Sequence, residues 1–217
     1  MYVVQVDAKT FKVKGNDQSV TNITLHPNVS MTTLKSVISD TIVINDSSRN
    51  CFDYNNDPTM GIEYGKLYTE LSALNIPYPH YTQYPVILQG ICPNGWHVPN
   101  DSDFLQLEYT AGMSPGTAGI MFKFRGTISD RLKVTGPEWW FSEGTDDFGF
   151  SAKGSGVYEC TSQGCEFYWL TSSCYFWTYS NEFQCSMMRL FSTMDLGIWR
   201  GYYTFDNGAL SVRCVKN

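Results

Sequence analysis

The sequence has few charged residues, and neither sign is concentrated in one place. Charged residues make up 17% of the 217 positions, the net charge is −6, and lysine and arginine form no cluster. Because contacts to phosphate dominate nucleic-acid affinity, nucleic acid is not an expected partner, and anionic membrane surfaces are disfavoured for the same reason.

Long apolar runs are also missing. No stretch approaches the roughly 20 apolar residues that a bilayer-spanning helix needs, so we expect no membrane insertion. The first residues, MYVVQVDAKTFKVKG, alternate in character and carry charges from the start, so no secretory signal is visible there.

Histidine is scarce, with only His26, His80 and His97, and no CxxC pair occurs. A zinc site usually needs four ligands in CxxC or HxxxH spacing, so we predict no metal site. Glu143, Asp146 and Asp147 offer oxygen atoms that calcium prefers, but we interpret them as a solvated acidic turn. Calcium is the one cofactor alternative that the sequence leaves open.

Aromatic residues and cysteines are, by contrast, abundant. Aromatics make up 15% of the chain, and there are seven cysteines, an odd number that leaves at least one free or paired between chains. This number of cysteines favours an oxidising setting, extracellular or on a virion.

Residues 1–50 predict a β-rich N-terminal segment. The stretches YVVQV, KTFKVKG, TNITLH and TIVIND are β-branched and alternating, and polar turns separate them. Because about 50 residues bury little core alone, we interpret this segment as a stalk, linker or oligomer contact, with homo-oligomerisation through it as a hypothesis. The sequence becomes loop-like from Cys51, and we place a domain boundary there.

Two helices are predicted in the remainder, 51–217. Residues 65–75 carry Leu67, Leu71 and Leu74 at helical spacing. A second helix follows Asn100, a capping residue, with Asp103 in its first turn and Gly112 as its C-terminal glycine. A loop-rich β region then leads to a closing strand, GALSVRCVKN, in which Leu210, Val212 and Cys214 share one face.

The stretch ICPNGWHVPNDSDF, residues 91–104, brings a cysteine, a tryptophan and a histidine together. A zinc site and a nucleophilic Cys92 with His97 as base are two interpretations. We favour a structural corner, with Cys92 bridged to another cysteine, Trp96 in the core and His97 hydrogen-bonded near the helix. Cys214 is the natural partner for Cys92, because its strand face is apolar.

Two further cysteine pairs are candidates for bridges. Cys160 and Cys165 enclose TSQG, a hairpin-like loop, and we predict a local disulfide between them, with two free thiols as the alternative. Cys174 and Cys185 lie within one aromatic region and could bridge each other.

Five ordered segments resemble the Fibrobacter succinogenes major paralogous domain, a family of Bacteroidetes, Fibrobacter and their phages. They are GKLY (65–68), CPNGWHVPNDSDF (92–104), RLKVTG (131–136), DDFGFSAKGSG (146–156) and LSVRCVKN (210–217). The resemblance covers the chain from about residue 51 to its last residue.

The resemblance implies an α+β, C-type-lectin-like domain over 51–217, in which two helices flank a small twisted antiparallel sheet. The chain ends meet on neighbouring strands in that fold, which agrees with a Cys92–Cys214 bridge. The formylglycine-generating enzymes share this fold, but their terminal arginine-glycine-glycine-serine run is absent, since the nearest stretch reads Trp199-Arg200-Gly201-Tyr202. We therefore predict no catalytic residues and no enzyme, and keep an oxidase-like enzyme as the alternative.

An aromatic surface is the predicted ligand-binding site. Residues 174–205 hold ten aromatics, of which Phe176 and Trp177 are expected in the core. Tyrosine and tryptophan combine a large contact area with a polar group, which suits protein and glycan ligands. The predicted binding residues are Tyr179, Phe183, Asp195, Trp199, Tyr202, Tyr203, Phe205 and Asn207.

The resemblance adds a hypothesis about variation in this region. Some members of such families are variable proteins of diversity-generating retroelements, in which adenine-directed mutation of asparagine codons changes ligand choice. Several residues fit the products of that mutation, namely Tyr179, Phe183, Ser192, Thr193, Asp195, Gly201, Tyr202, Tyr203, Phe205 and Asn207.

These observations together predict a ligand-binding or adhesion protein. We expect a phage tail-fibre receptor-binding tip, which needs no export signal, or a bacterial surface adhesin. The expected partner is a host-cell surface protein or glycan, and the expected location is the virion or the cell surface. A purely structural appendage subunit is a further alternative.

Overall fold

The computed structural model describes the backbone of residues 10–14 and 20–24, and residues 51–75, 84–142, 144–203 and 208–217 in full. The chain divides into two compact units, 1–47 and 48–217. In the first unit, β1 (Thr10–Lys14) and β2 (Val20–Thr24) pair antiparallel, with Thr10 opposite Thr24. They coincide with the predicted strands KTFKVKG and TNITLH, whereas YVVQV and TIVIND lie outside the described residues.

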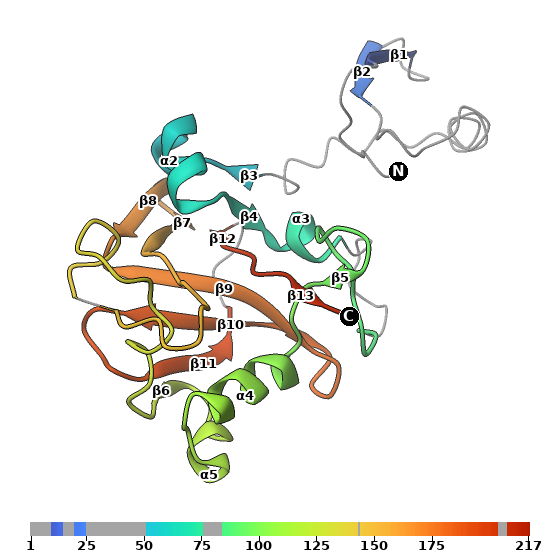
Figure 1. The fold of residues 1–217 in the computed structure, drawn as a ribbon. Coiled ribbons are helices and arrows are strands. Elements are labelled where there is room, and N and C mark those ends of the chain that lie inside the picture. The colour runs from blue at the N-terminus through green and yellow to red at the C-terminus, as the bar shows by residue number, and fades with distance from the viewer. Residues whose placement is uncertain (1–9, 15–19, 25–50, 76–83, 143, 204–207) are drawn as a thin grey trace. The chain divides into compact units, whose positions relative to one another are not determined.

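A nine-stranded mixed sheet dominates the second unit (Figure 1). Its strands are ordered β3-β4-β12-β7-β9-β10-β11-β6, and β8 pairs with β7. The parallel pairing is between β7 and β9, at Gly156 and Cys174. The bounds are β3 (Cys51–Phe52), β4 (Leu67–Thr69), β6 (Lys123–Arg125), β7 (Ser155–Thr161), β8 (Gly164–Leu170), β9 (Ser173–Ser180), β10 (Cys185–Ser192), β11 (Ile198–Tyr202) and β12 (Ala209–Leu210).

The helices of this unit are short. They are the 3-10 turn η1 (Tyr54–Asn56), α2 (Pro58–Tyr64), α3 (Glu70–Leu74), α4 (Asp101–Thr110) and α5 (Pro115–Ala118). A separate two-stranded sheet joins β5 (Trp96–His97) to β13 (Val215–Lys216), next to the end of the chain (Figure 1).

The predicted fold class is therefore wrong. In place of a small antiparallel sheet flanked by two helices, the described part of the second unit has a nine-stranded mixed sheet, a small second sheet and four short α-helices. The difference arises mainly between residues 155 and 202, where the expected loop-rich region forms five strands of five to eight residues.

Both faces of the central strands are covered by other parts of the protein. The sequence of this region therefore lacks the alternation of apolar and polar residues that is typical of a strand with one exposed face. Along β9, Phe176 faces one hydrophobic cluster with Phe104 and Phe191. The next residue, Trp177, faces a second cluster on the opposite side of the sheet. Successive side chains of a strand point to opposite faces, so a strand buried on both faces is apolar at nearly every position.

Helix α4 begins as predicted. Asn100 Oδ1 accepts a hydrogen bond from the backbone N–H of Asp103, and Asp103 Oδ2 accepts one from the N–H of Asn100. This reciprocal capping satisfies two donors that the first turn would leave unpaired. After Ala111, Gly112 adopts a φ of +104°, the left-handed conformation that glycine tolerates best.

A buried ion network holds α4 against the sheet. The Glu108 carboxylate accepts hydrogen bonds from Arg125 Nη1 at 3.0 Å and Nη2 at 2.7 Å, and from Arg189 Nε at 2.8 Å. Two turns earlier, Asp101 Oδ1 accepts from Arg189 Nη2 at 2.7 Å and from Arg200 Nε at 2.9 Å. The three arginines come from β6, β10 and β11, so the network joins one helix to three adjacent strands.

The other predicted helix, 65–75, is wrong over its first half. Leu67 lies in β4, and the helix starts only at Glu70. Leu67, Leu71 and Leu74 are all buried, as their spacing predicts, but a strand followed by a single helical turn buries them. The predicted closing strand is also divided, into β12 and β13.

Candidate ligand-binding site

The corner formed by residues 92–97 is fastened to the end of the chain. A disulfide joins Cys92 to Cys214, with 5.7 Å between their Cα atoms. Beyond it, Trp96 pairs with Lys216 and His97 pairs with Val215 in the β5–β13 ladder. A covalent bond and a strand pairing therefore fix the same contact between residues more than a hundred positions apart.

His97 is a structural residue of this corner, as expected. Its side chain is buried, Nδ1 lies 2.6 Å from Asn217 Oδ1, and Nε2 lies 3.2 Å from Asp103 Oδ2. Both ring nitrogens are thus engaged within the protein. The interpretation of His97 as a base for Cys92 fails, because Cys92 is in a disulfide and has no thiol.

Trp96, however, does not lie in the core, and that expectation is wrong. Its side chain is 40% exposed, because β5 alternates and its neighbour His97 takes the inward position. The indole lies instead at the mouth of a pocket.

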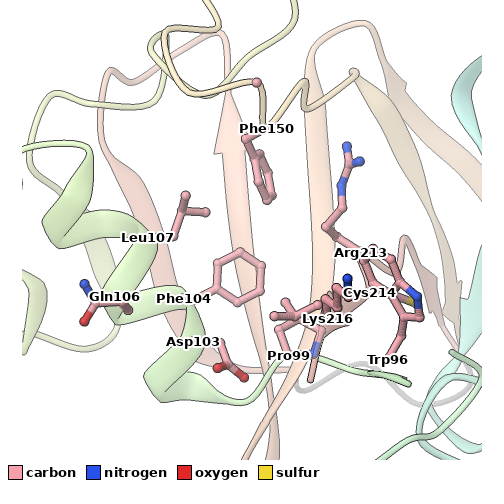
Figure 2. Close-up of a pocket in the computed structure, with 12 residues that line it drawn as sticks. Trp96, Pro99, Asp103, Phe104, Gln106, Leu107, Phe150, Arg213, Cys214 and Lys216 are labelled. Carbon is pink, nitrogen blue, oxygen red and sulfur yellow. The ribbon is translucent and has the colours of Figure 1, made fainter. Parts of the chain in front are cut away.

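This pocket, which we call the Trp96 pocket, has a volume of about 390 Å³. Figure 2 shows Phe104 and Leu107 projecting from α4 and Phe150 reaching toward the same space, with Trp96 and Lys216 on the other side. The lining residues are Trp96, Pro99, Asp103, Phe104, Gln106, Leu107, Gly149, Phe150, Arg213, Cys214, Val215 and Lys216.

The apolar walls of the Trp96 pocket are held by the main core. The ring of Phe150 packs 5.5 Å from Phe176 and 5.9 Å from Phe191, centroid to centroid. Phe104, on the capped helix, lies 6.3 Å from both Phe150 and Phe176. These contacts are made among the protein's own side chains, so the core fixes the apolar walls of the pocket.

Polar groups gather at the edge of the pocket. The Arg213 guanidinium lies 5.1 Å from the centre of the Phe150 ring and donates from Nη2 to the carbonyl of Ser151 at 3.2 Å. Lys216 adds a second cation, whereas Asp103 Oδ2 is occupied by His97 and Asn100. A mostly apolar cavity with a few fixed polar groups is the usual form of a small-ligand or side-chain site.

Of the predicted binding residues, Tyr179 is part of the core, and Tyr203 and Trp199 are partly buried and pack against it. Tyr179 is 0% exposed and its hydroxyl donates to the carbonyl of Val86 at 3.0 Å, so it presents no surface to a ligand. Tyr203 packs edge-on against Trp177, with 4.9 Å between ring centres, and Trp199 packs in the same way against Phe124 at 5.8 Å. The sequence did not reveal this packing.

Among the predicted residues that are exposed, Asp195 lies apart from Phe183 and Tyr202. Phe183, 43% exposed, lies in the turn between β9 and β10, and Tyr202, 36% exposed, ends β11 beside Phe122. Asp195 lies in the turn at the other end of β10, a strand of eight residues, or about 25 Å of extended chain. Phe205 and Asn207 lie outside the described residues.

Cys160 and Cys165 form a disulfide, as predicted. The predicted Cys92–Cys214 disulfide is also present. Cys51, Cys174 and Cys185 are free, so the suggested Cys174–Cys185 bridge is absent. Burial raises the pKa of the Cys174 thiol to about 11, and burial followed by the nearby Asp101 and Glu70 carboxylates raises that of Cys185 to about 11. Both thiols are therefore protonated, and poor nucleophiles, at neutral pH.

The acidic turn is occupied by the protein's own groups. Asp146 accepts hydrogen bonds from the N–H and the hydroxyl of Ser151, and Asp147 pairs with Arg131 at 2.7 Å, while Glu143 lies outside the described residues. Within the described residues, no cluster of three or more potential metal ligands was found. No helix in that part of the chain has the length and apolar character to cross a bilayer.

The sequence comparisons give one match. The family model of the Fibrobacter succinogenes major domain matches residues 21–216, and so begins within the 1–50 segment, earlier than the five motifs indicate. Searches of curated proteins and of solved structures found no match.

Proposed function

Because this chain belongs to the Fibrobacter succinogenes major domain family, for which the match itself indicates no activity, we propose its function from its own geometry. It is a ligand-binding and adhesion domain that receives an apolar group of a host-cell surface protein or glycan in the Trp96 pocket. Its carrier is a phage tail-fibre tip or a bacterial surface protein.

The observation that carries this proposal is the Trp96 pocket itself. A half-exposed indole, two core-anchored phenylalanines and the cations Arg213 and Lys216 converge on a cavity of about 390 Å³. Rigid apolar walls lower the cost of ordering the site when a ligand binds. Aromatic side chains are also typical anchors of protein and glycan contacts.

The disulfides agree with the extracellular or virion location that we propose for an adhesin. The Cys92–Cys214 disulfide closes a long loop, and its Cys214 half lines the pocket. Disulfides of this kind persist outside reducing compartments, which supports a virion or cell-surface location.

The enzyme alternative receives less support from the site. The cysteine in the Trp96 pocket is bridged, and the pKa values of Cys174 and Cys185 are raised, not lowered. An oxidase-like reaction through a thiolate would need a lowered thiol pKa.

Retroelement diversification, as part of the proposal, is restricted to a smaller set of positions. Tyr179, Ser192 and Gly201 are buried, so variation there would disturb packing before it changed a surface. Phe183 and Tyr202 are exposed. A near-copy in neighbouring DNA that differs at adenines in these two codons would support diversification, and differences confined to the buried codons would count against it.

The proposal is tested with the full chain and the fluorescent anion 8-anilinonaphthalene-1-sulfonate, whose apolar rings and sulfonate match the pocket and its cations. Trp96→Ala should weaken binding at least tenfold. Trp169→Ala removes an indole of similar exposure, 56% against 40%, outside the pocket and should have no effect. Unfolding temperatures of both variants report whether the fold is kept.

The same pair of variants then decides between adhesion and a purely structural role. Labelled wild-type protein and Trp169→Ala should adhere to host cells or to glycans on an array, and Trp96→Ala should not. Adhesion that survives Trp96→Ala at full strength would reject this pocket as the site. If the wild type binds neither host cells nor any glycan on the array, the structural appendage is favoured.

A further inference from the structure

A second cavity lies on the other side of the chain segment that forms the wall of the Trp96 pocket. Its volume is about 580 Å³, and Arg213 and Cys214 line both cavities. We call it the serine cavity. Residues 62–68, the 151–155 segment, β9 and the segment after β12 surround it.

Hydroxyl groups form the floor of the serine cavity. Ser155 Oγ lies 2.8 Å from Ser211 Oγ and donates to the Cys174 sulfur at 3.2 Å, and all three side chains are buried. Burial raises the pKa of Cys174 to about 11, so the thiol adds no negative charge to this floor at neutral pH. Tyr68, on the wall, brings a further hydroxyl-bearing side chain to the cavity.

Cations dominate the wall. Lys66, Lys153 and Arg213 line the cavity together with a single acidic residue, Glu63. The Asp53 carboxylate, 2.6 Å from Lys66 Nζ, neutralises one of these cations from outside the lining. A surplus of positive charge in a cavity of a protein with a net charge of −6 attracts anions to that place.

Two of these cations are held in position by aromatic rings and carbonyls. Lys153 Nζ donates to the Glu63 carbonyl at 2.5 Å and lies 3.8 Å from the centre of the Trp139 ring. Arg213 rests on Phe150 and donates to Ser151 in a similar way. These contacts are to rings and carbonyl oxygens and not to carboxylates, so they leave both cations available for an incoming anion.

We propose that the serine cavity binds an acidic sugar. The sugar carboxylate pairs with Lys153 and Arg213, and its hydroxyls exchange hydrogen bonds with Ser155, Ser211 and Tyr68. A charge-assisted bond to a guanidinium fixes orientation, and several hydroxyl partners distinguish a sugar from a simple anion. The site shares Arg213 with the Trp96 pocket, but Lys153, Ser155 and Ser211 line the serine cavity alone, so the inference stands whether or not the Trp96 pocket binds an apolar group.

The test is isothermal titration calorimetry of the full chain with D-glucuronate and D-galacturonate, against the neutral sugars D-glucose and D-galactose. At low salt, an acidic sugar should bind at least tenfold more tightly than its neutral counterpart, and added sodium chloride should weaken it. Equal binding of the acidic and neutral sugars, or no heat from either acid at millimolar concentration, would overturn the proposal.

Variants locate the binding. Lys153→Gln should weaken the acidic sugar at least tenfold, and Lys123→Gln, which removes an exposed cation on β6 outside the cavity, should not. If Lys153→Gln fails to fold, Lys66→Gln, whose side chain is 43% exposed, serves in its place with a smaller expected loss. Unchanged affinity in the folded variant would reject the cavity as the site.

Two further measurements separate this inference from its rivals. Trp96→Ala should leave acidic-sugar binding unchanged, so failure of the Trp96 pocket and failure of the serine cavity are distinguishable. Inorganic phosphate should compete at least tenfold more weakly than the acidic sugar. Competition at equal concentration would show a general anion site and would overturn the sugar assignment.

Discussion

Adjacent residues of this protein often have opposite roles, and the choice between them depends on which faces of a strand are covered. Trp96 and His97 are neighbours on β5, yet the indole lines a pocket while the imidazole bonds internally to Asn217 and Asp103. Tyr202 and Tyr203 show the same contrast at the end of β11. The sequence predicted the residue types of a binding surface but could not tell the exposed members of such pairs from the buried ones.

Tyr202 and Tyr203 provide a direct test of this contrast. Tyr203→Ala should lower the free energy of unfolding by about 2–4 kcal/mol, because it removes a ring packed against Trp177 in the core. Tyr202→Ala should cost about 1 kcal/mol or less, because its ring is partly exposed and loses mainly the contact with Phe122.

Urea unfolding followed by tryptophan fluorescence measures both values. If the two alanine variants were equally stable, the packing of Tyr203 against Trp177 would contribute nothing to stability.

At the scale of elements, the predictions that held were those that depend on local chemistry. The helix after Asn100 begins with the expected Asn100–Asp103 capping and is followed by Gly112 in the left-handed conformation. The predicted helix at 65–75 failed at its start, because Gly65 has a φ of +86° and Leu67 pairs with Phe52 in the sheet. The spacing of three leucines cannot show that one of them pairs with a distant strand.

The long central strands were not predicted, for a related reason. β9 has buried residues on both faces, so its sequence CYFWTYS lacks the alternation of a strand with one exposed face. We therefore expected that some of these aromatic rings would be exposed. In the structure, two hydrophobic clusters on opposite faces of the sheet contain them. The Trp96 pocket was missed because its walls come from segments that only the fold brings together, although exposed Trp96 lies in the motif that the sequence singled out.

The attachment of α4 to the sheet should depend on Glu108. Glu108→Gln leaves Arg125 and Arg189 buried with one fewer negative charge, and should lower the free energy of unfolding by about 3–5 kcal/mol. The control is Asp147→Asn, which breaks a solvent-exposed pair with Arg131 and should leave chemical unfolding unchanged within error. Equal stability of Glu108→Gln and wild type would remove the network as the element that fixes α4.

The two disulfides should contribute unequally. Replacing Cys92 and Cys214 with alanine opens a loop with a sequence separation of 122 and should cost about 4–5 kcal/mol in the chain-entropy model. Replacing Cys160 and Cys165 opens a separation of 5 and should cost about 2 kcal/mol in the same model.

Thermal and urea unfolding of the two double variants give the comparison. The first variant should also weaken binding of 8-anilinonaphthalene-1-sulfonate, because Cys214 lines the Trp96 pocket, and the second should not. A larger loss from the short loop would contradict this ranking.

For the whole molecule, stability should fall in acid through Asp101. Burial alone would raise the pKa of this carboxyl, but the hydrogen bonds and charges of Arg200 and Arg189 outweigh it, and the pKa lies below its ordinary value. A lowered folded-state pKa stabilises the protein above the unfolded value of about 3.9, and the contribution is lost as pH falls through the folded-state value.

Urea unfolding from pH 7 to pH 2 checks this sign. Wild type should lose stability below about pH 4. Asp101→Asn should be less stable than wild type at pH 7, but the difference should shrink as the pH falls. A difference that is constant over the whole range would show that ionised Asp101 adds nothing to the folded state.

The two-unit organisation leads to a prediction about assembly. If residues 1–50 form an oligomer contact, the full chain should associate in sedimentation experiments and residues 48–217 should sediment as a monomer. A 50-residue segment with little core of its own gains stability from such contacts. Identical sedimentation of the two proteins would leave the segment as a linker or stalk.

The bond between Cys92 and Cys214 also sets an order of events during synthesis. One wall of the Trp96 pocket consists of residues 213–216, which are made more than a hundred positions after Trp96, so a nascent chain has the tryptophan long before it has a cavity. Sites built from such distant segments form late in folding. Ligand capture is therefore a property of the oxidised protein in which both segments have been made, and a nascent chain that lacks the second segment would not hold its target.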